Sequence, residues 1–260
     1  MPSENLNISG LQFDIVWEDK DRNIFCIEEL INNIDDNCDV IVLPEMFSTG
    51  FSMNAKNLAE TMNGDTIKWM LNTAKSKDAV ITGSLIFKEN NYYRNRLLWV
   101  DPNGEINYYD KRHSFGLAGE NQYFKNGNEM VIFTYKNWKI FASICYDLRF
   151  PAWLKNRYDY HILLNVANWP DTRAKHWNSF VNARAIENQS YVIAVNRIGT
   201  DGEGRTYSGD SSIIDYDGNV LSKASNTETI INSKLNMQNL LDFRTNFPFL
   251  KDQDKFEIIN

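Results

Sequence analysis

The chain has 260 residues, 43% hydrophobic and 23% charged, which is typical of a folded globular protein rather than a disordered one. Its formal net charge of −7 provides no basic surface, so we expect no nucleic-acid partner and no binding to an anionic membrane. The N-terminal residues lack the pattern of a secretory signal and the three cysteines are scattered, so we expect a cytoplasmic protein without a disulfide framework.

Strands and helices alternate along the first half of the chain. Apolar side chains at helical spacing predict amphipathic helices over 20–36 and 64–77. Short apolar or alternating runs, the last three of them separated by turn residues, predict strands at 7–14, 38–45, 79–87, 92–100 and 105–110. These last three strands have no room for a helix between them, so we expect an antiparallel meander.

The second half begins with a glycine-bearing loop over 111–127. A helix is predicted to start near Leu148 and another to cover 174–188. A glycine-rich loop and a hairpin at D-Y-D-G-N-V follow the last of the strands predicted here, which lie at 129–135, 138–144, 160–167 and 190–196.

We interpret residues 1–260 as a single α/β domain, because no linker or repeat divides the chain. The pattern favours two mixed sheets packed together with helices outside. Residues 228–260 form a more polar C-terminal tail that carries several large apolar groups, and we expect it to dock on a partner subunit. Those groups are Phe243, Phe247, Phe249 and Leu250.

Cys145 lies where a predicted strand ends and a helix begins, at the carboxyl end of the strand, where α/β sheets place their sites. A helix N-terminus there would lower the thiol pKa, and its N–H groups could bind an oxyanion. Cys26 and Cys38 fit ordinary core positions. Position alone leaves Cys145 open between a packed residue and a nucleophile.

A nucleophilic thiol needs a base, and His113 and His176 could face a site, whereas His161 lies inside an apolar strand. The other option is a carboxylate and an ammonium. Glu45 follows one apolar strand and Lys111 follows another. Each alone could be a solvated loop charge, but together three strand ends deliver a carboxylate, an ammonium and a thiol, a set suited to acyl transfer without histidine.

Three motifs carry a family resemblance: L-P-E, D-K-R-H and I-C-Y-D-L-R-F-P, in that order. With them the chain resembles the nitrilase (carbon–nitrogen hydrolase) superfamily, whose Glu–Lys–Cys triad corresponds to Glu45, Lys111 and Cys145. The loop H-S-F-G-L-A-G-E-N-Q-Y-F is similar to the family loop that carries a second glutamate, here Glu120. The resemblance implies a four-layer α-β-β-α sandwich that forms a homodimer.

Further segments resemble the bacterial omega-amidase branch of this superfamily: P-E-M-F-S-T-G-F, V-A-N-W-P, R-A-I-E-N-Q-S-Y-V-I-A-V-N-R-I-G and D-G-E-G. This implies an amidase that releases ammonia from the terminal amide of dicarboxylic 2-oxo acid amides, namely 2-oxoglutaramate and 2-oxosuccinamate, through a cysteine thioester, with no cofactor and no metal. The alternatives are another amidase or a carbamoylase of the superfamily, or a catalytically silent scaffold on the same fold.

On this interpretation Glu45 is the base, and Lys111 with the backbone N–H of Tyr146 stabilises the oxyanion. Glu120 orients Lys111. Arginine suits the substrate carboxylate because its planar fork binds both oxygens.

The candidate arginines are Arg149 and Arg173. Arg149 could equally be an ion-pair partner of Asp147 or Glu187. Aromatic residues that could form the apolar walls of the pocket are Phe115, Trp169 and Trp177.

Overall fold

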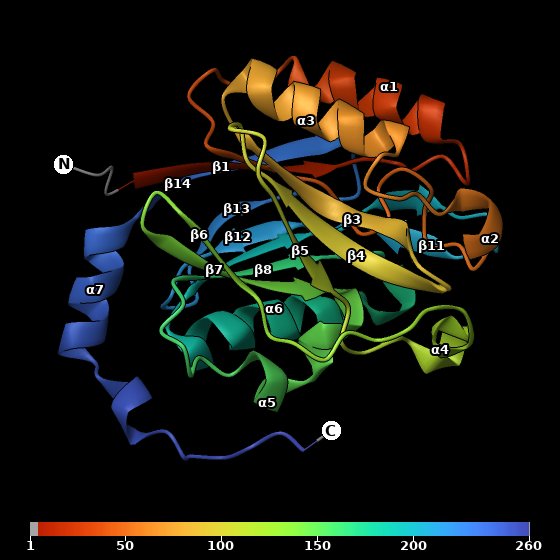
Figure 1. Cartoon of the computed structure of the whole chain (residues 1–260). Helices are drawn as coiled ribbons and strands as arrows, with labels where there is room; N and C mark the ends of the chain where they lie inside the picture. Colours follow the sequence, from red (N-terminus) through yellow and green to blue (C-terminus); the bar gives the residue numbers. More distant parts are fainter. Residues whose placement is uncertain (1–4, 260) are drawn as a thin grey trace.

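The computed structural model describes residues 5–259, which form two six-stranded sheets packed face to face (Figure 1). In the first sheet, three central strands run parallel and their outer neighbours are antiparallel to them. The strand order is β14 (Thr229–Asn236), β1 (Asn5–Gln12), β2 (Val40–Val42), β3 (Val80–Glu89), β4 (Tyr92–Val100) and β5 (Ile106–Asp110). The predicted antiparallel meander is therefore β3–β4–β5.

The second sheet repeats this plan, with a parallel centre and antiparallel flanks. Its order is β13 (Val220–Lys223), β12 (Ser212–Ile214), β9 (Tyr191–Val195), β8 (Ile162–Val166), β7 (Trp138–Ile144) and β6 (Ile132–Tyr135). A separate hairpin, β10 (Ile198–Thr200) and β11 (Thr206–Ser208), follows β9.

Helices cover the outer face of each sheet, so the predicted α-β-β-α layering is confirmed (Figure 1). The first sheet carries α1 (Lys20–Ile31) and α3 (Asp65–Lys77), and the second carries α5 (Pro151–Leu154) and α6 (Ala174–Asn188). The remaining α-helices in residues 5–259 are α2 (Ala55–Leu58), α4 (Glu120–Tyr123) and α7 (Met237–Asn246). Within that range, no helix is long and apolar enough to cross a membrane.

The core between the sheets is built from apolar side chains on the inner face of each strand, and each fully buried aliphatic side chain contributes roughly 1.5–3 kcal/mol. Gly10 on β1 allows the sheets to approach closely, because a Cβ there would lie 2.7 Å from Val195 Cγ2. A second apolar cluster joins the first sheet to α1 and α3. Both faces of β2 and β3 are thereby covered, which explains why β2 is wholly apolar and why Val80 to Phe87 of β3 are all buried.

Several predicted elements end or begin elsewhere, and three of these differences have a structural consequence. Helix α1 stops at Ile31 rather than at 36, because the asparagines and aspartates that follow compete for backbone hydrogen bonds. Strand β2 is only Val40–Val42, so Pro44 and Glu45 lie on the turn beyond it. The helix predicted near Leu148 is instead a 3₁₀ turn over Cys145–Arg149, followed by α5.

The segment 228–260 is not a tail along its whole length, because Thr229–Asn236 forms β14 in antiparallel register with β1. Its sequence, T-I-I-N-S-K-L-N, shows little regular alternation of apolar and polar residues, and only Ile231 and Leu235 of this strand are buried. Farther on, α7 packs on its own chain. Leu240 is buried and the Phe243 ring lies 4.8 Å from that of Tyr216.

Candidate active site

Glu45 is fully buried on the turn that follows β2. Its Oε1 accepts hydrogen bonds from Lys111 Nζ and from Asn95 Nδ2, both at 2.8 Å. Its Oε2 accepts from the backbone N–H of Asn168 at 2.8 Å. Both oxygens are therefore held by groups from three other segments of the chain.

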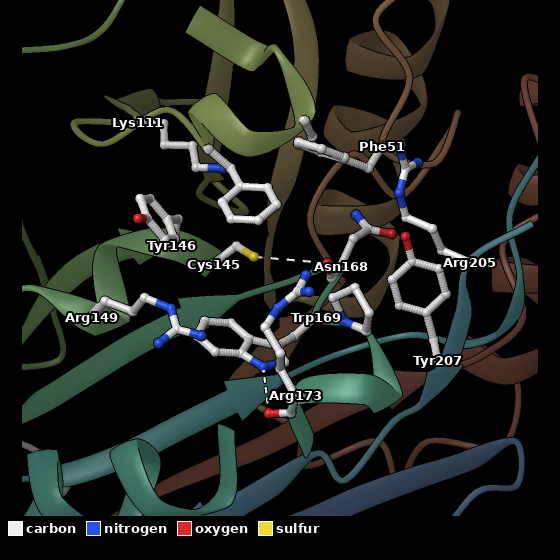
Figure 2. A pocket seen from close by; sticks show the side chains of 13 residues that line it. Phe51, Lys111, Cys145, Tyr146, Arg149, Asn168, Trp169, Arg173, Arg205 and Tyr207 are labelled. Atoms are coloured by element: carbon white, nitrogen blue, oxygen red, sulfur yellow. Dashed lines mark hydrogen bonds between the residues drawn. The ribbon is translucent and has the colours of Figure 1, made fainter. Parts of the chain in front are cut away.

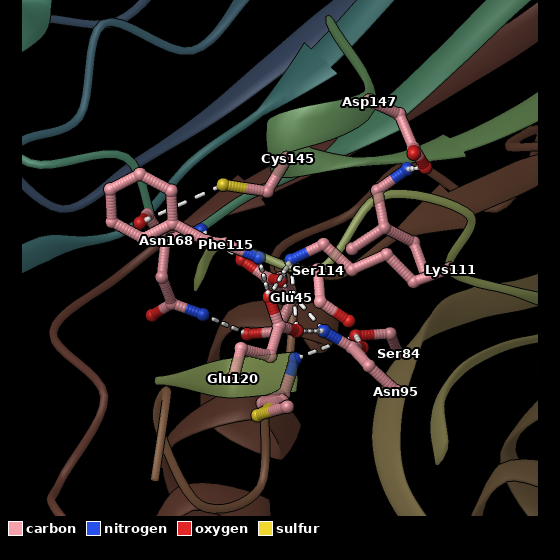
Figure 3. A network of polar contacts seen from close by, with 12 residues as sticks. Glu45, Ser84, Asn95, Lys111, Ser114, Phe115, Glu120, Cys145, Asp147 and Asn168 are labelled. Atoms are coloured by element: carbon pink, nitrogen blue, oxygen red, sulfur yellow. Dashed lines mark hydrogen bonds and ion pairs between the residues drawn. The ribbon is translucent and has the colours of Figure 1, made fainter. Parts of the chain in front are cut away.

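Lys111 follows β5 directly, and its ammonium bridges Glu45 and Glu120 (Figure 3). Nζ lies 3.0 and 2.9 Å from the two Glu120 oxygens. Burial alone would lower the pKa of Lys111, but the charges of Glu120 and Glu45 outweigh it and raise the pKa above its usual value. The ammonium is protonated throughout the physiological range.

Glu120 is the first residue of α4 and is fully buried. Its carboxylate also accepts from Asn95 Nδ2 at 3.1 Å and from the backbone N–H of Phe115. Burial raises the pKa of Glu120, with the Lys111 charge opposing this and the Glu45 charge adding to it.

Cys145 occupies a sharp turn at the end of β7, with a φ of 44° in the left-handed region that non-glycine residues rarely adopt. Strained strand-to-helix turns of this kind present nucleophiles in hydrolases. The thiol lines a pocket, with Sγ 3.8 Å from the carbonyl oxygen of Asn168.

The pKa of Cys145 is raised well above its usual value, so the predicted lowering is wrong. Burial is the largest cause, the Glu45 charge adds to it, and Lys111 only partly opposes them. The dipole expected to lower the pKa is small, because a short 3₁₀ turn replaces the predicted helix. The resting group is a neutral thiol beside a carboxylate, which suits proton removal by Glu45.

Asp147 stabilises the turn that carries Cys145 through hydrogen bonds to its side chain. Its Oδ2 accepts from the Ile144 N–H at 2.9 Å and from the Tyr109 hydroxyl at 2.8 Å. Its Oδ1 accepts from His113 through both the backbone N–H and Nδ1, at 3.0 and 2.7 Å. Sequence reasoning considered Asp147 only as a partner of Arg149, so this role was missed.

The histidines are engaged elsewhere. Beyond His113, His161 Nδ1 accepts from the Lys139 N–H, and His176 contacts Arg149. Within residues 5–259, no hydrogen bond joins Cys145 to a histidine. The groups gathered beside the thiol are the carboxylate and the ammonium.

Cys145 lines a pocket, and most of the residues predicted to form its walls line it as well (Figure 2). Five predicted residues besides Cys145 and Lys111 line it: Phe115, Tyr146, Arg149, Trp169 and Arg173. Trp177 is not among the lining residues. Its ring lies 5.6 Å from that of Trp169, and its Nε1–H donates to the Asp210 carbonyl oxygen.

Arg149 pairs with neither of the acids suggested for it. Glu187 is held by Arg184 instead. The Arg149 guanidinium lies 4.8 Å from the centre of the Trp169 ring, and its Nη2 lies 3.1 Å from His176 Nδ1. Burial lowers the pKa of Arg149, and the Arg173 charge lowers it further while Tyr146 opposes both.

Sequence reasoning also missed two asparagines and one arginine. Asn95 binds both Glu45 and Glu120, and Asn168 binds Glu45 through its backbone N–H and donates from its side chain to the Glu45 carbonyl. The only signal for Asn168 was its place in V-A-N-W-P, whereas Asn95 lies inside a strand like any other polar residue. Arg205 lines the pocket from a loop that the sequence marks only by its glycines.

Comparison with known proteins agrees with this arrangement. A family model for carbon-nitrogen hydrolases matches residues 7–244. An omega-amidase of Escherichia coli K12 is 41% identical over 254 residues, 97% of this chain and 98% of that protein. A 2-oxoglutaramate amidase of Bacillus subtilis is 34% identical over 250 residues, covering 94% and 96% of the two chains.

Among solved structures, a protein of Xanthomonas campestris superposes with a TM-score of 0.95 and 37% sequence identity, over 98% of this chain and 99% of that one. It is described as a CN-hydrolase superfamily protein with an arsenic adduct in its active site. On this sequence and structural similarity over nearly its whole length, the chain belongs to the carbon–nitrogen hydrolase family.

Proposed function

We propose that the chain is an omega-amidase, which hydrolyses the terminal amide of dicarboxylic 2-oxo acid amides such as 2-oxoglutaramate to the 2-oxo acid and ammonia. The observation that carries the proposal is the buried ammonium of Lys111 held between Glu45 and Glu120 at the base of the pocket that Cys145 lines. The similarity to an omega-amidase and a 2-oxoglutaramate amidase supports the choice of substrate.

In the first half of the reaction Glu45 accepts the thiol proton, and the Cys145 sulfur attacks the amide carbonyl. The oxyanion is stabilised by Lys111 and by the backbone N–H of Tyr146, at typically about 3–4 kcal/mol per donor. Lys111 starts with its ammonium directed at carboxylate oxygens. Once Glu45 is protonated it attracts the ammonium less, which frees an N–H for the oxyanion.

The second half completes the exchange. Glu45 passes its proton to the departing nitrogen, which leaves as ammonia while the C–N bond breaks and a thioester remains on Cys145. Glu45 then takes a proton from water, and the resulting hydroxide attacks the thioester. The C–S bond breaks, the thiolate recovers its proton from Glu45, and the 2-oxo acid is released. Glu120 keeps Lys111 protonated and in place throughout.

Arg149 and Arg173 are two candidates for binding the substrate carboxylate. No salt bridge to an acid joins either of them to another of residues 5–259, and their mutual repulsion favours an anion between them. Their guanidinium groups rest on aromatic rings, Arg149 on Trp169 and Arg173 on Phe115, with 5.2 Å from Arg173 Cζ to the Phe115 ring centre. The same rings form the apolar wall.

Ammonia release from a panel of amides tests this function. The panel is 2-oxoglutaramate, 2-oxosuccinamate, glutamine, N-carbamoyl amino acids and simple nitriles. We expect the highest kcat/KM for the 2-oxo acid amides. Release from the carbamoyl compounds or from glutamine, but not from 2-oxoglutaramate, would instead assign the chain to another branch. Cys145→Ala should abolish turnover, and turnover that survives this change would favour a non-catalytic role for the site.

We also propose that the enzyme works in the cytoplasm as a homodimer to which the C-terminal segment contributes. Phe247 and Phe249 support this, since their side chains are 46% and 62% exposed although they are large and apolar. Light scattering after gel filtration should give a dimer for the parent chain and a monomer for the double variant Phe247→Ser, Phe249→Ser. The same change at the exposed Phe25, far from this segment in the sequence, is the control.

A further inference from the structure

A third arginine lines the pocket from the β10–β11 hairpin. Arg205 lies just before β11, and Tyr207 within that strand lines the pocket beside it. In Figure 2 this pair lies on the opposite side of Cys145 from Tyr146 and Arg149. The Arg205 side chain is 38% exposed, so its guanidinium is open to an incoming anion.

The acid beside Arg205 has its hydrogen-bonding needs met without that guanidinium. Asp201 is fully buried at its side chain and accepts the Tyr207 hydroxyl at 2.7 Å. It also accepts two backbone N–H groups at 2.9 Å, those of Glu203 and Arg205. The contact from Arg205 Nη1 to Asp201 is longer, at 3.3 Å. It tethers the guanidinium and leaves its other donors for a ligand.

The hairpin is itself held firmly. Tyr207 is almost fully buried, with its ring centre 4.7 Å from the guanidinium carbon of the fully buried Arg197. On the other side Thr206 donates to Asp171, at the start of the short turn that carries Arg173. Movement of the hairpin would disturb both contacts, so they hold the backbone that carries Arg205 in place.

We propose that Arg205 is a specificity-determining residue that binds the carboxylate end of the substrate, and that Asp201 and Tyr207 are positioning residues that fix its distance from Cys145. The inference rests on the proposed omega-amidase activity and adds to it a residue on the wall opposite Arg149. Because the hairpin is held in place, the distance from Arg205 to Cys145 is set. The pocket therefore favours amides whose carboxylate reaches Arg205 when their amide carbonyl carbon lies at Cys145.

Protection of Cys145 from alkylation tests the proposal without depending on turnover. Iodoacetamide, which is neutral, labels the thiol, and peptide mass spectrometry gives the rate at Cys145. The product 2-oxoglutarate should slow this labelling in the parent enzyme. In Arg205→Gln the half-protecting concentration should rise about 10- to 100-fold, as expected for a lost hydrogen bond to a charged group. The labelling rate without 2-oxoglutarate should stay unchanged.

Three further variants separate charge recognition from structural support. Arg205→Lys should recover part of the protection, because it keeps the charge but not the planar fork. Arg22→Gln, a loss of an exposed arginine on α1, should behave like the parent. Tyr207→Phe should raise the half-protecting concentration less than Arg205→Gln does, with unchanged labelling when no ligand is present.

Equal protection in the parent and in Arg205→Gln would overturn the proposal. So would a large change in the unprotected labelling rate, because it would mean that Arg205 supports the fold of the pocket. If the parent fails to hydrolyse 2-oxoglutaramate while protection by 2-oxoglutarate still depends on Arg205, the omega-amidase function falls and the carboxylate site stands.

Discussion

The ammonium of Lys111 lies 2.8 Å from a carboxylate oxygen of Glu45, and both side chains are almost completely buried. Such a pair gains little over apolar packing, but removing one partner leaves an uncompensated charge. Stability alone therefore does not account for the arrangement. Its position beside the Cys145 thiol gives it that use.

Replacing Lys111 with Met should destabilise the fold as well as abolish activity. Two buried carboxylates would lose their shared cation, and we expect the free energy of unfolding at neutral pH to fall by about 3–5 kcal/mol. Chemical denaturation measures this. Lys68→Met is the control, since its pair with Asp65 is exposed, and it should leave stability unchanged. Equal stability of the Lys111 variant and the parent would contradict the ion-pair account.

Glu45→Gln should lower kcat/KM by about 10²- to 10⁴-fold, the usual range for loss of a general base. The substitution should also change the pKa of the Cys145 thiol. Because the Glu45 charge raises the pKa of Cys145, its removal should lower that pKa, and the pH midpoint of Cys145 alkylation should move to lower pH. The exposed Glu105→Gln is the control. An unchanged or higher midpoint would show that Glu45 does not act on the thiol.

Asp147→Asn should slow the chemistry without touching the triad. The amide would place an NH₂ group against donors such as the Ile144 N–H or His113, and the turn that aims Cys145 would lose its brace. We expect a loss of about 1–3 kcal/mol in stability and slower alkylation of Cys145. Normal alkylation in a stable Asp147→Asn variant would rule out this bracing role.

The stability of the protein should fall as the pH is lowered from about 6.5 toward 4, in part because of His161. Burial, with Arg244 adding to it, lowers the pKa of His161 to about 4. The unfolded chain therefore binds a proton in this window while the native protein does not, which favours unfolding at lower pH. This lowering of the His161 pKa corresponds to a loss of at most about 3 kcal/mol in the free energy of unfolding.

Denaturation of the parent and of His161→Gln at pH 7.5 and pH 5 tests this. Gln does not titrate, so the variant should lose less stability between the two values. An equal loss in both proteins would mean that His161 does not contribute.

The members of the candidate site, Glu45, Lys111 and Cys145, can be recognised in the sequence because each follows a strand. Short apolar runs mark the strand ends, but Glu45 and Lys111 follow strands of one sheet and Cys145 follows a strand of the other. Strand ends alone therefore do not bring the three together, and the family resemblance is needed to group them. Asn95 could not be found this way, since its role depends on the pleat of β4 turning it toward Glu45 and Glu120.

Two failures have a common physical origin in tertiary context. The thiol pKa was predicted from a helix dipole, but burial and the Glu45 charge determine its direction. The mostly polar sequence of β14 predicts part of a tail, and only pairing with β1 makes it a strand. Local patterns do not report either effect.

The most direct test of the account is the chemical state of Cys145 during turnover. The enzyme is mixed with 2-oxoglutaramate, quenched in acid within the first turnovers and digested, and the Cys145 peptide is weighed by mass spectrometry. We expect a mass increase equal to the substrate less ammonia, present in the parent and absent in Cys145→Ala. Ammonia release by the parent with no such adduct on Cys145, or with an adduct on another residue, would contradict it.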